Sequence, residues 1–172
     1  IDNRLQDNGE YGGGWGDDCE MWRNWVPVLI AFDDPKITQA QEFFSNALLS
    51  QPHMQKGYTS HLTDVEHTAE DSADTLTPMM HIAPDDETWS RKVFQLADLM
   101  ESLWMGLNER GFFQFKSIYF SSEKVDSRPE RAYDSVYHPR AVQPALLYWQ
   151  RTGDIRFTKL FLSKLALVMV LN

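Results

Sequence analysis

The chain has 172 residues, of which 42% are hydrophobic, and a formal net charge of −9. This length and apolar content suit one domain with one core. The acidic balance argues against nucleic acid as a partner, because nucleic-acid affinity depends on Lys and Arg neutralising phosphates. With a single cysteine, Cys19, the chain cannot form an internal disulfide. The most apolar run, residues 160–171, is too short to span a bilayer and contains Ser163 and Lys164.

Hydrophobic spacing along the chain predicts mostly helix. The clearest case is 87–108, where apolar residues recur at helical spacing. Residues 112–120 alternate in part and predict a short strand-like segment. Long loops are expected at 51–63 and 121–131. We expect helices over approximately 17–32, 35–48, 65–82, 87–108, 139–151 and from 155 onward.

The two ends of the sequence suggest a piece of a longer protein. Residues 1–14 are polar and glycine-rich, and we expect a flexible lead-in without a signal-peptide pattern. Val168 to Asn172 lie inside an apolar run that has no helix-capping signal. We therefore expect residues 1–172 to form a single partial domain that is cut within a C-terminal helix.

Three stretches share one layout, in which polar or acidic residues precede an apolar run that contains a proline and ends in a turn. The prolines are Pro27, Pro78 and Pro144. A proline inside a helix costs about 3 kcal/mol unless its neighbours absorb the kink. The layout predicts three kinked helices whose polar N-terminal halves meet at one rim. The alternative is that the prolines only bend inner helices around a core.

The second of these stretches, residues 61–74, is rich in acids and histidines. We expect Glu66 or Glu70 to form the acid and base pair with Asp17 or Asp18 of the first stretch. One carboxylic acid would protonate a glycosidic oxygen while the other carboxylate acts as base or nucleophile, at a separation of roughly 5–10 Å. His67 and Asp71 would position a sugar. His61, Asp64 and His67 could also ligate a divalent ion, although no established zinc spacing is present. The alternative is a solvated acidic helix start.

The third stretch combines tyrosine, histidine and arginine. In a lyase, Tyr137 or His138 could abstract a proton while Arg140 stabilises the enolate. In a hydrolase, Arg140 with Tyr133 and Asp134 would hold an acidic sugar. The alternative is that Tyr137 and His138 cap a helix and that Arg140 is a surface charge.

The first stretch places paired acids beside indoles. Asp17 and Asp18 lie close to Trp15, Trp22 and Arg23 in the sequence. Carboxylates suit sugar hydroxyls and indoles suit sugar ring faces. The nearby glycines would let the backbone approach a ligand, but they are equally typical of a flexible loop.

Two segments carry a resemblance to known proteins. Residues 138–154, HPRAVQPALLYWQRTGD, resemble the helical hairpins of the (α/α) toroid carbohydrate-active enzymes, in which an inner helix passes through a TGD turn to an outer helix. Residues 14–18, GWGDD, and the helix after them are similar as well. The resemblance implies a central cleft that acts on a glycan. Glycoside hydrolases and polysaccharide lyases both use this fold, so the fold alone does not choose between them.

The sequence therefore predicts an all-α chain, made of helical hairpins of an incomplete (α/α) toroid. We expect hydrolysis of glycosidic bonds in a polysaccharide or oligosaccharide, including acidic ones, without a cofactor. A polysaccharide lyase and a non-catalytic helical-repeat binding module are the alternatives. The expected partners are a glycan and the remaining hairpins of the same chain, and a periplasmic or secreted location is slightly favoured. The catalytic candidates are Asp17, Asp18, Glu66, Glu70, Tyr137 and His138, and the substrate-binding candidates are Trp15, Trp22, Arg23, His67, Asp71, Tyr133, Asp134 and Arg140.

Overall fold

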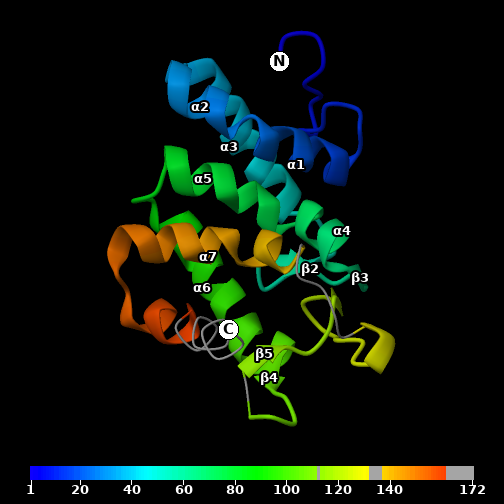
Figure 1. The fold of residues 1–172 in the computed structure, drawn as a ribbon. Helices are drawn as coiled ribbons and strands as arrows, with labels where there is room; N and C mark the ends of the chain where they lie inside the picture. The colour runs from blue at the N-terminus through cyan, green and yellow to red at the C-terminus, as the bar shows by residue number, and fades with distance from the viewer. Residues whose placement is uncertain (112, 132–136, 162–172) are drawn as a thin grey trace.

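The protein is seen in a computed structural model that describes residues 1–111, 113–131 and 137–161. It is mostly helical, with short strands beside the helices (Figure 1), which confirms the predicted all-α class. The α-helices are α1 (Trp15–Asn24), α2 (Val26–Phe32), α3 (Pro35–Leu49), α4 (Val65–Glu70), α5 (Leu76–Ile82), α6 (Glu87–Leu99) and α7 (His138–Thr152). Residues 155–161 are also helical.

Capping residues set several of these helix ends as the sequence predicts. The Asp34 carboxylate accepts a hydrogen bond from the Lys36 N–H at 2.8 Å, and Pro35 occupies the first position of α3. Gly153 ends α7 in the left-handed conformation, with φ of 66°. Asp154 then accepts from the Arg156 N–H at 2.8 Å, which starts the next helix.

The predicted repeat of three proline-kinked helices is wrong for its first two members. The expected helix 17–32 breaks at Trp25, so Pro27 lies at the start of α2. The expected helix 65–82 is divided into α4, a 3₁₀ turn (Ala73–Thr75) and α5, with Pro78 in the first turn of α5. The N–H groups of a helix's first turn have no intrahelical acceptor, so a proline there loses no hydrogen bond. Of the three prolines, only Pro144 lies beyond the first turn of its helix.

Three antiparallel strand pairs flank the helices: β1 (Met54–Gln55) with β2 (Tyr58–Thr59), β3 (Thr63–Asp64) with β6 (Tyr119–Phe120), and β4 (Met105–Leu107) with β5 (Phe113–Phe115). Strands β5 and β6 confirm the strand-like segment predicted near 112–120. The expected helix 87–108 is wrong at its end, because α6 passes through a π-helical turn (Met100–Trp104) into β4. The buried Trp104 indole fixes this change by donating to the Ser121 carbonyl at 2.7 Å. The loop expected at 51–63 contains β1 and β2 and ends in β3.

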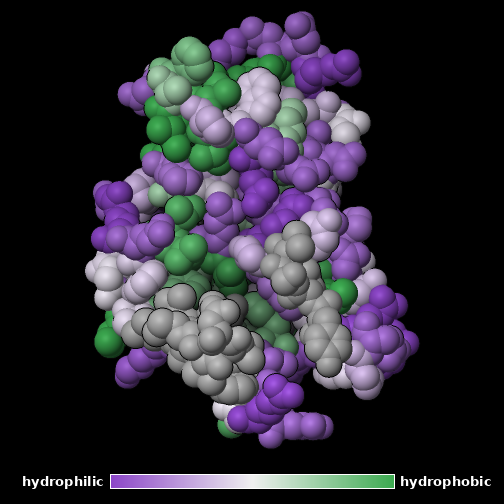
Figure 2. Space-filling view, in the orientation of Figure 1, coloured by the Kyte–Doolittle hydropathy of each residue, from purple (hydrophilic) through white to green (hydrophobic). Residues whose placement is uncertain are grey.

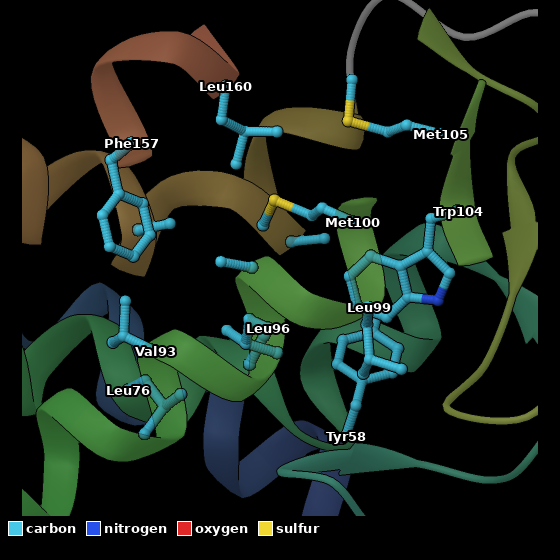
Figure 3. Packing of buried hydrophobic residues seen from close by; sticks show 14 of the residues in the cluster. Tyr58, Leu76, Val93, Leu96, Leu99, Met100, Trp104, Met105, Phe157 and Leu160 are labelled. Atoms are coloured by element: carbon cyan, nitrogen blue, oxygen red, sulfur yellow. The ribbon is translucent and has the colours of Figure 1, made fainter. Parts of the chain in front are cut away.

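The helices pack around two groups of buried side chains. Helix α7 contacts α4, α5 and α6, while α5 also contacts α2 and α3 (Figure 1). The larger core lies among α5, α6, α7 and the strands, and includes Tyr58, Leu96 and Trp104 (Figure 3). The smaller core joins α1, α2 and α3 through Trp22 and Phe44. This packing places the first turn of α7 against α4.

Helix α2 leaves apolar side chains exposed. Ile30 is 58% exposed and Phe32 71%, and Trp25, which precedes the helix, is 43% exposed. Figure 2 shows hydrophobic surface over the end of the molecule where α2 lies in Figure 1. Among the described residues, none of the helices combines the length and apolar character needed to cross a bilayer, in agreement with the sequence.

Candidate functional site

One arginine gathers carboxylates from three parts of the chain. Arg140, whose side chain is 8% exposed, lies in the first turn of α7. Its Nε donates to Asp74 Oδ2 at 2.9 Å, and Nη2 bonds the same oxygen. Its Nη1 donates to Glu70 Oε1 at 3.0 Å and lies 3.4 Å from Glu66 Oε1, and Nη2 lies 3.6 Å from Glu20 Oε1. We call these five residues the Arg140 cluster.

The cluster confirms that the three polar stretches meet. Glu20 comes from α1, Glu66 and Glu70 from α4, and Arg140 from α7, although the proline repeat that suggested the meeting is only partly present. It also changes the role expected for Arg140. A guanidinium in contact with four carboxylates is already neutralised, so it is poorly placed to hold an acidic sugar or an enolate.

A second guanidinium lies beside the buried end of the cluster. Arg23 Nη2 donates to Gln143 Oε1 at 3.0 Å, and Arg23 Nε lies 3.4 Å from Asp74 Oδ1. The side chain of Asp74 is fully buried. Burial raises the pKa of Asp74, while the charges of Arg140 and Arg23 oppose that rise. Four carboxylates share two guanidinium groups, so the site keeps an excess of acid.

The three remaining carboxylates differ in environment. The side chain of Glu70 is 12% exposed, that of Glu66 31% and that of Glu20 44%. Burial raises the pKa of Glu70, and the nearby Glu20 adds to this effect, while Arg140 opposes it. Glu70 can therefore hold a proton at a higher pH than an ordinary glutamate.

The two predicted catalytic aspartates of α1 lie in different surroundings. Asp18 is buried, and its carboxylate accepts from the Tyr11 N–H at 2.6 Å and the Gly13 N–H at 3.1 Å. A Cβ on Gly13 would lie 2.8 Å from Asp18 Oδ1, so this approach requires glycine. Asp18 thus fastens the N-terminal segment onto α1, and this geometry gives its predicted catalytic role no support. Asp17 is exposed.

The indoles near these acids pack inside the protein. Trp22 is 1% exposed and contacts the rings of Tyr11 and Trp25 at centroid distances of 5.6 and 6.1 Å. This burial contradicts its predicted role in stacking on a sugar. Trp15 is half-buried and lies 5.8 Å from the Phe44 ring. Both indoles are part of the smaller core or its edge.

The candidate lyase bases lie around the start of α7. His138 Nε2 is 2.8 Å from the Ser117 carbonyl, and its ring stacks on Phe115 at 4.3 Å. A ring nitrogen that faces a carbonyl oxygen must carry the proton, so Nε2 is a donor and Nδ1 is the nitrogen that would act as a base. Tyr137 is 40% exposed at the N-terminal end of α7. Tyr133 and Asp134 lie outside the described residues.

His61 does not join Asp64 and His67 in the metal-binding group predicted from the sequence. His67 Nδ1 lies 2.8 Å from the Asp64 carboxylate, and this hydrogen bond raises the pKa of His67. His61 instead faces Asp71, with Nδ1 3.8 Å from Oδ2, and stacks on His53.

Sequence reasoning missed three residues of these groups. His53 was not selected because its proximity to His61 depends on the β1–β2 hairpin. Glu20 and Asp74 stand among other acidic residues in the sequence and are not among the predicted site residues. The spacing of Glu66, Glu70 and Asp74, with four residues from each to the next, is a signal that could have indicated a shared face.

No family model, curated protein or solved structure matches this chain.

Proposed function

We propose that the chain is part of an enzyme that hydrolyses glycosidic bonds, with Glu70 as general acid and Glu66 as the second carboxylate. The observation that carries this proposal is the pairing of the two side chains at one atom. Their oxygens lie 3.0 and 3.4 Å from Arg140 Nη1, so they are no more than about 6.4 Å apart. This upper limit includes the separation of about 5–5.5 Å at which the second carboxylate acts as nucleophile, and it lies below the roughly 6.5–9.5 Å at which the second carboxylate activates a water.

The different surroundings of the two groups support the division of roles. Glu70 is the more buried side chain, and its raised pKa suits a group that must deliver a proton to the leaving oxygen. Glu66 is more exposed and lies beside the Arg140 guanidinium, which suits a group that acts as a carboxylate. Glu70 would protonate the leaving oxygen while Glu66 attacks the sugar, and water, deprotonated by Glu70, would then hydrolyse the bond between Glu66 and the sugar.

The charge of the site supports a neutral or basic glycan over an acidic one. The Arg140 cluster and Arg23 contain four carboxylates and two guanidinium groups, so an anionic sugar would be repelled. Asp17 and His67 are exposed and Asp71 is half-buried, so their side chains could bind sugar hydroxyls around the cluster.

The lyase alternative receives less support. Elimination needs a base and a cation that stabilises the enolate. Arg140 is surrounded by carboxylates, so it is poorly placed to stabilise an enolate.

We further infer that the helical hairpins belong to an incomplete (α/α) toroid. The convergence of α1, α4 and α7 on one polar cluster supports this, because toroid enzymes place polar helix ends at a common centre.

The proposal is tested by incubating the protein with neutral, amino-sugar and acidic polysaccharides. Release of reducing ends measures hydrolysis, and ultraviolet absorbance of an unsaturated product measures elimination. Glu70→Gln and Glu66→Gln should each lower the rate of release by about 10²–10⁴-fold, the usual contribution of acid–base catalysis. Glu42→Gln, which changes an exposed carboxylate on α3, is the matched control and should leave the rate unchanged.

Three results would contradict the proposal. Unsaturated product in place of reducing ends would favour the lyase. Equal rates in Glu70→Gln and the wild type would remove Glu70 from the chemistry. Binding of a glycan without any turnover would favour the non-catalytic binding module.

A further inference from the structure

The β1–β2 hairpin brings two histidines into contact. Lys56 and Gly57 have φ values of 55° and 74°, as a two-residue type I′ turn requires. The hairpin is extended beyond its strands by a hydrogen bond from the Ser60 N–H to the His53 carbonyl at 2.8 Å. The next residue, His61, therefore lies beside His53, and their rings stack at a centroid distance of 4.6 Å with an interplanar angle of 11°.

A carboxylate from α4 faces the same pair. Asp71 follows the last residue of α4, and its Oδ2 is 3.8 Å from His61 Nδ1. One ligand atom from each of His53, His61 and Asp71 lies within 4.8 Å of the other two. The hairpin is tied to α4 by a buried hydrogen bond of 2.8 Å between Tyr58 Oη and Thr68 Oγ1. The relative position of the three residues is thus set by packed backbone elements.

Within the described ranges, no hydrogen bond occupies the two imidazoles or the Asp71 carboxylate. His61 donates only its backbone N–H, to Thr59 Oγ1 at 3.2 Å. The lone pairs of the three side chains are therefore available to a ligand without breaking an existing bond. This contrasts with His67, whose Nδ1 is already 2.8 Å from Asp64.

We propose that His53, His61 and Asp71 bind a divalent transition-metal ion such as Zn²⁺. Imidazole nitrogen and carboxylate oxygen are zinc ligands at about 2.0–2.2 Å, and the two stacked imidazole rings would have to turn so that one nitrogen of each faces the ion. Three protein ligands leave a fourth position for water or another ligand.

Another set of metal-ligating side chains lies near the start of α4. A second group, Asp64, Glu66 and His67, also lies within 4.8 Å, but there an ion would have to break the His67–Asp64 bond and compete with Arg140 for Glu66.

The test is calorimetric titration of the metal-free protein with Zn²⁺, together with the visible absorption of the Co²⁺-substituted protein. The wild type should bind one equivalent, and Co²⁺ should show the bands of a low-coordinate site with nitrogen ligands. His61→Ala and Asp71→Asn should each weaken binding by at least about tenfold, the loss that even an indirect partner of a metal site can cause. His67→Ala changes an exposed histidine outside the site and should bind as the wild type does.

Absence of saturable Zn²⁺ binding by the wild type would overturn the proposal. It would also be overturned if His67→Ala lost as much affinity as His61→Ala, because the ion would then lie in the second group. Circular dichroism of each variant checks the fold. His61 is exposed, so its substitution should leave the helical signal unchanged. If His61→Ala does change that signal, the zinc affinity of Asp71→Asn decides between the outcomes.

Discussion

Replacing Arg140 with methionine should destabilise the protein strongly, because it removes the charge that the buried carboxylates share. Methionine keeps much of the side-chain length and removes the guanidinium. The Asp74 side chain is fully buried and that of Glu70 is 12% exposed, so both would remain as poorly compensated charges. Breaking a buried ion pair by removing one partner costs about 3–5 kcal/mol.

The expected value lies near the lower end of that range. Arg23 Nε stays 3.4 Å from Asp74 Oδ1 and compensates part of the charge. Glu66 and Glu20 are more exposed, and exposed pairs contribute only about 0–1 kcal/mol each. We therefore expect Arg140→Met to lower the free energy of unfolding by about 3 kcal/mol. For a urea dependence of about 1–3 kcal/mol per molar, the midpoint would fall by roughly 1–3 M.

The loss should depend on pH. The pKa values of Asp74 and Glu70 are already raised in the folded protein, and removal of the guanidinium would raise them further. The destabilisation is then fully present above the folded pKa values and disappears as pH falls towards the unfolded values of about 4. The difference between Arg140→Met and wild type should be smaller at pH 5 than at pH 7.5.

Urea titrations followed by tryptophan fluorescence at the two pH values measure this effect. Arg151→Met is the matched control, because Arg151 pairs at 2.6 Å with Asp85, whose side chain is 85% exposed. Its loss should stay below about 1 kcal/mol. A loss of the same small size in Arg140→Met, or one that grows as the pH falls, would refute the reasoning.

Two further predictions concern the region around the hairpin. The hydrogen bond with Asp64 raises the pKa of His67. The stabilising effect of this bond is therefore fully present below the unfolded pKa of about 6.5 and is lost as pH rises through the folded pKa. The urea midpoint of His67→Ala should lie below that of the wild type at pH 6 and match it at pH 9. Gly57→Ala should destabilise by about 1–2 kcal/mol in thermal unfolding, because φ is +74° and the new Cβ would lie 3.0 Å from Gln95 Oε1. Gly111→Ala is the control, because Gly111 has a φ of +77° and a Cβ there would have no atom within 4 Å. An equal loss of stability in both variants would show that the contact with Gln95 contributes nothing.

Elements defined by local signals could be predicted from the sequence. Asp34 with Pro35 marks the start of α3, and Gly153 marks the end of α7. The break at Trp25 could not be predicted, because apolar residues continue on both sides and tertiary packing decides where the chain turns. The break after Glu70 lies in a mostly polar run, residues 71–75, which fits an acidic helix start as well as a turn. The same holds for β4, whose apolar residues fit either a helix or a strand until Trp104 bonds to the distant Ser121 carbonyl.

The candidate site was predictable as residues but not as contacts. Glu66, Glu70 and Arg140 stand out in the sequence as charges near predicted helix starts. Arg140 contacts Glu66 and Glu70, which precede it in the chain by 74 and 70 positions. A single sequence does not reveal contacts between residues so far apart. The prediction therefore assigned Arg140 to a sugar, whereas in the folded chain it holds the acids. The predicted role of Trp22 is wrong for a similar reason, because an indole that could stack on a ligand can equally pack in a core.

The Arg140 cluster contributes both to stability and to the proposed chemistry, and substitutions of different members should separate the two contributions. Arg140 connects α7 to α1 and α4, so the guanidinium that stabilises this packing also holds Glu66 and Glu70 at one atom. Arg140→Met should therefore lose both stability and activity. Glu70→Gln removes a carboxylate whose ionisation is opposed by burial, so it should leave stability at neutral pH unchanged or higher while activity falls. If Glu70→Gln instead lost stability to the same extent as Arg140→Met, the carboxylate would be a structural partner of Arg140 and its assignment as the general acid would be wrong.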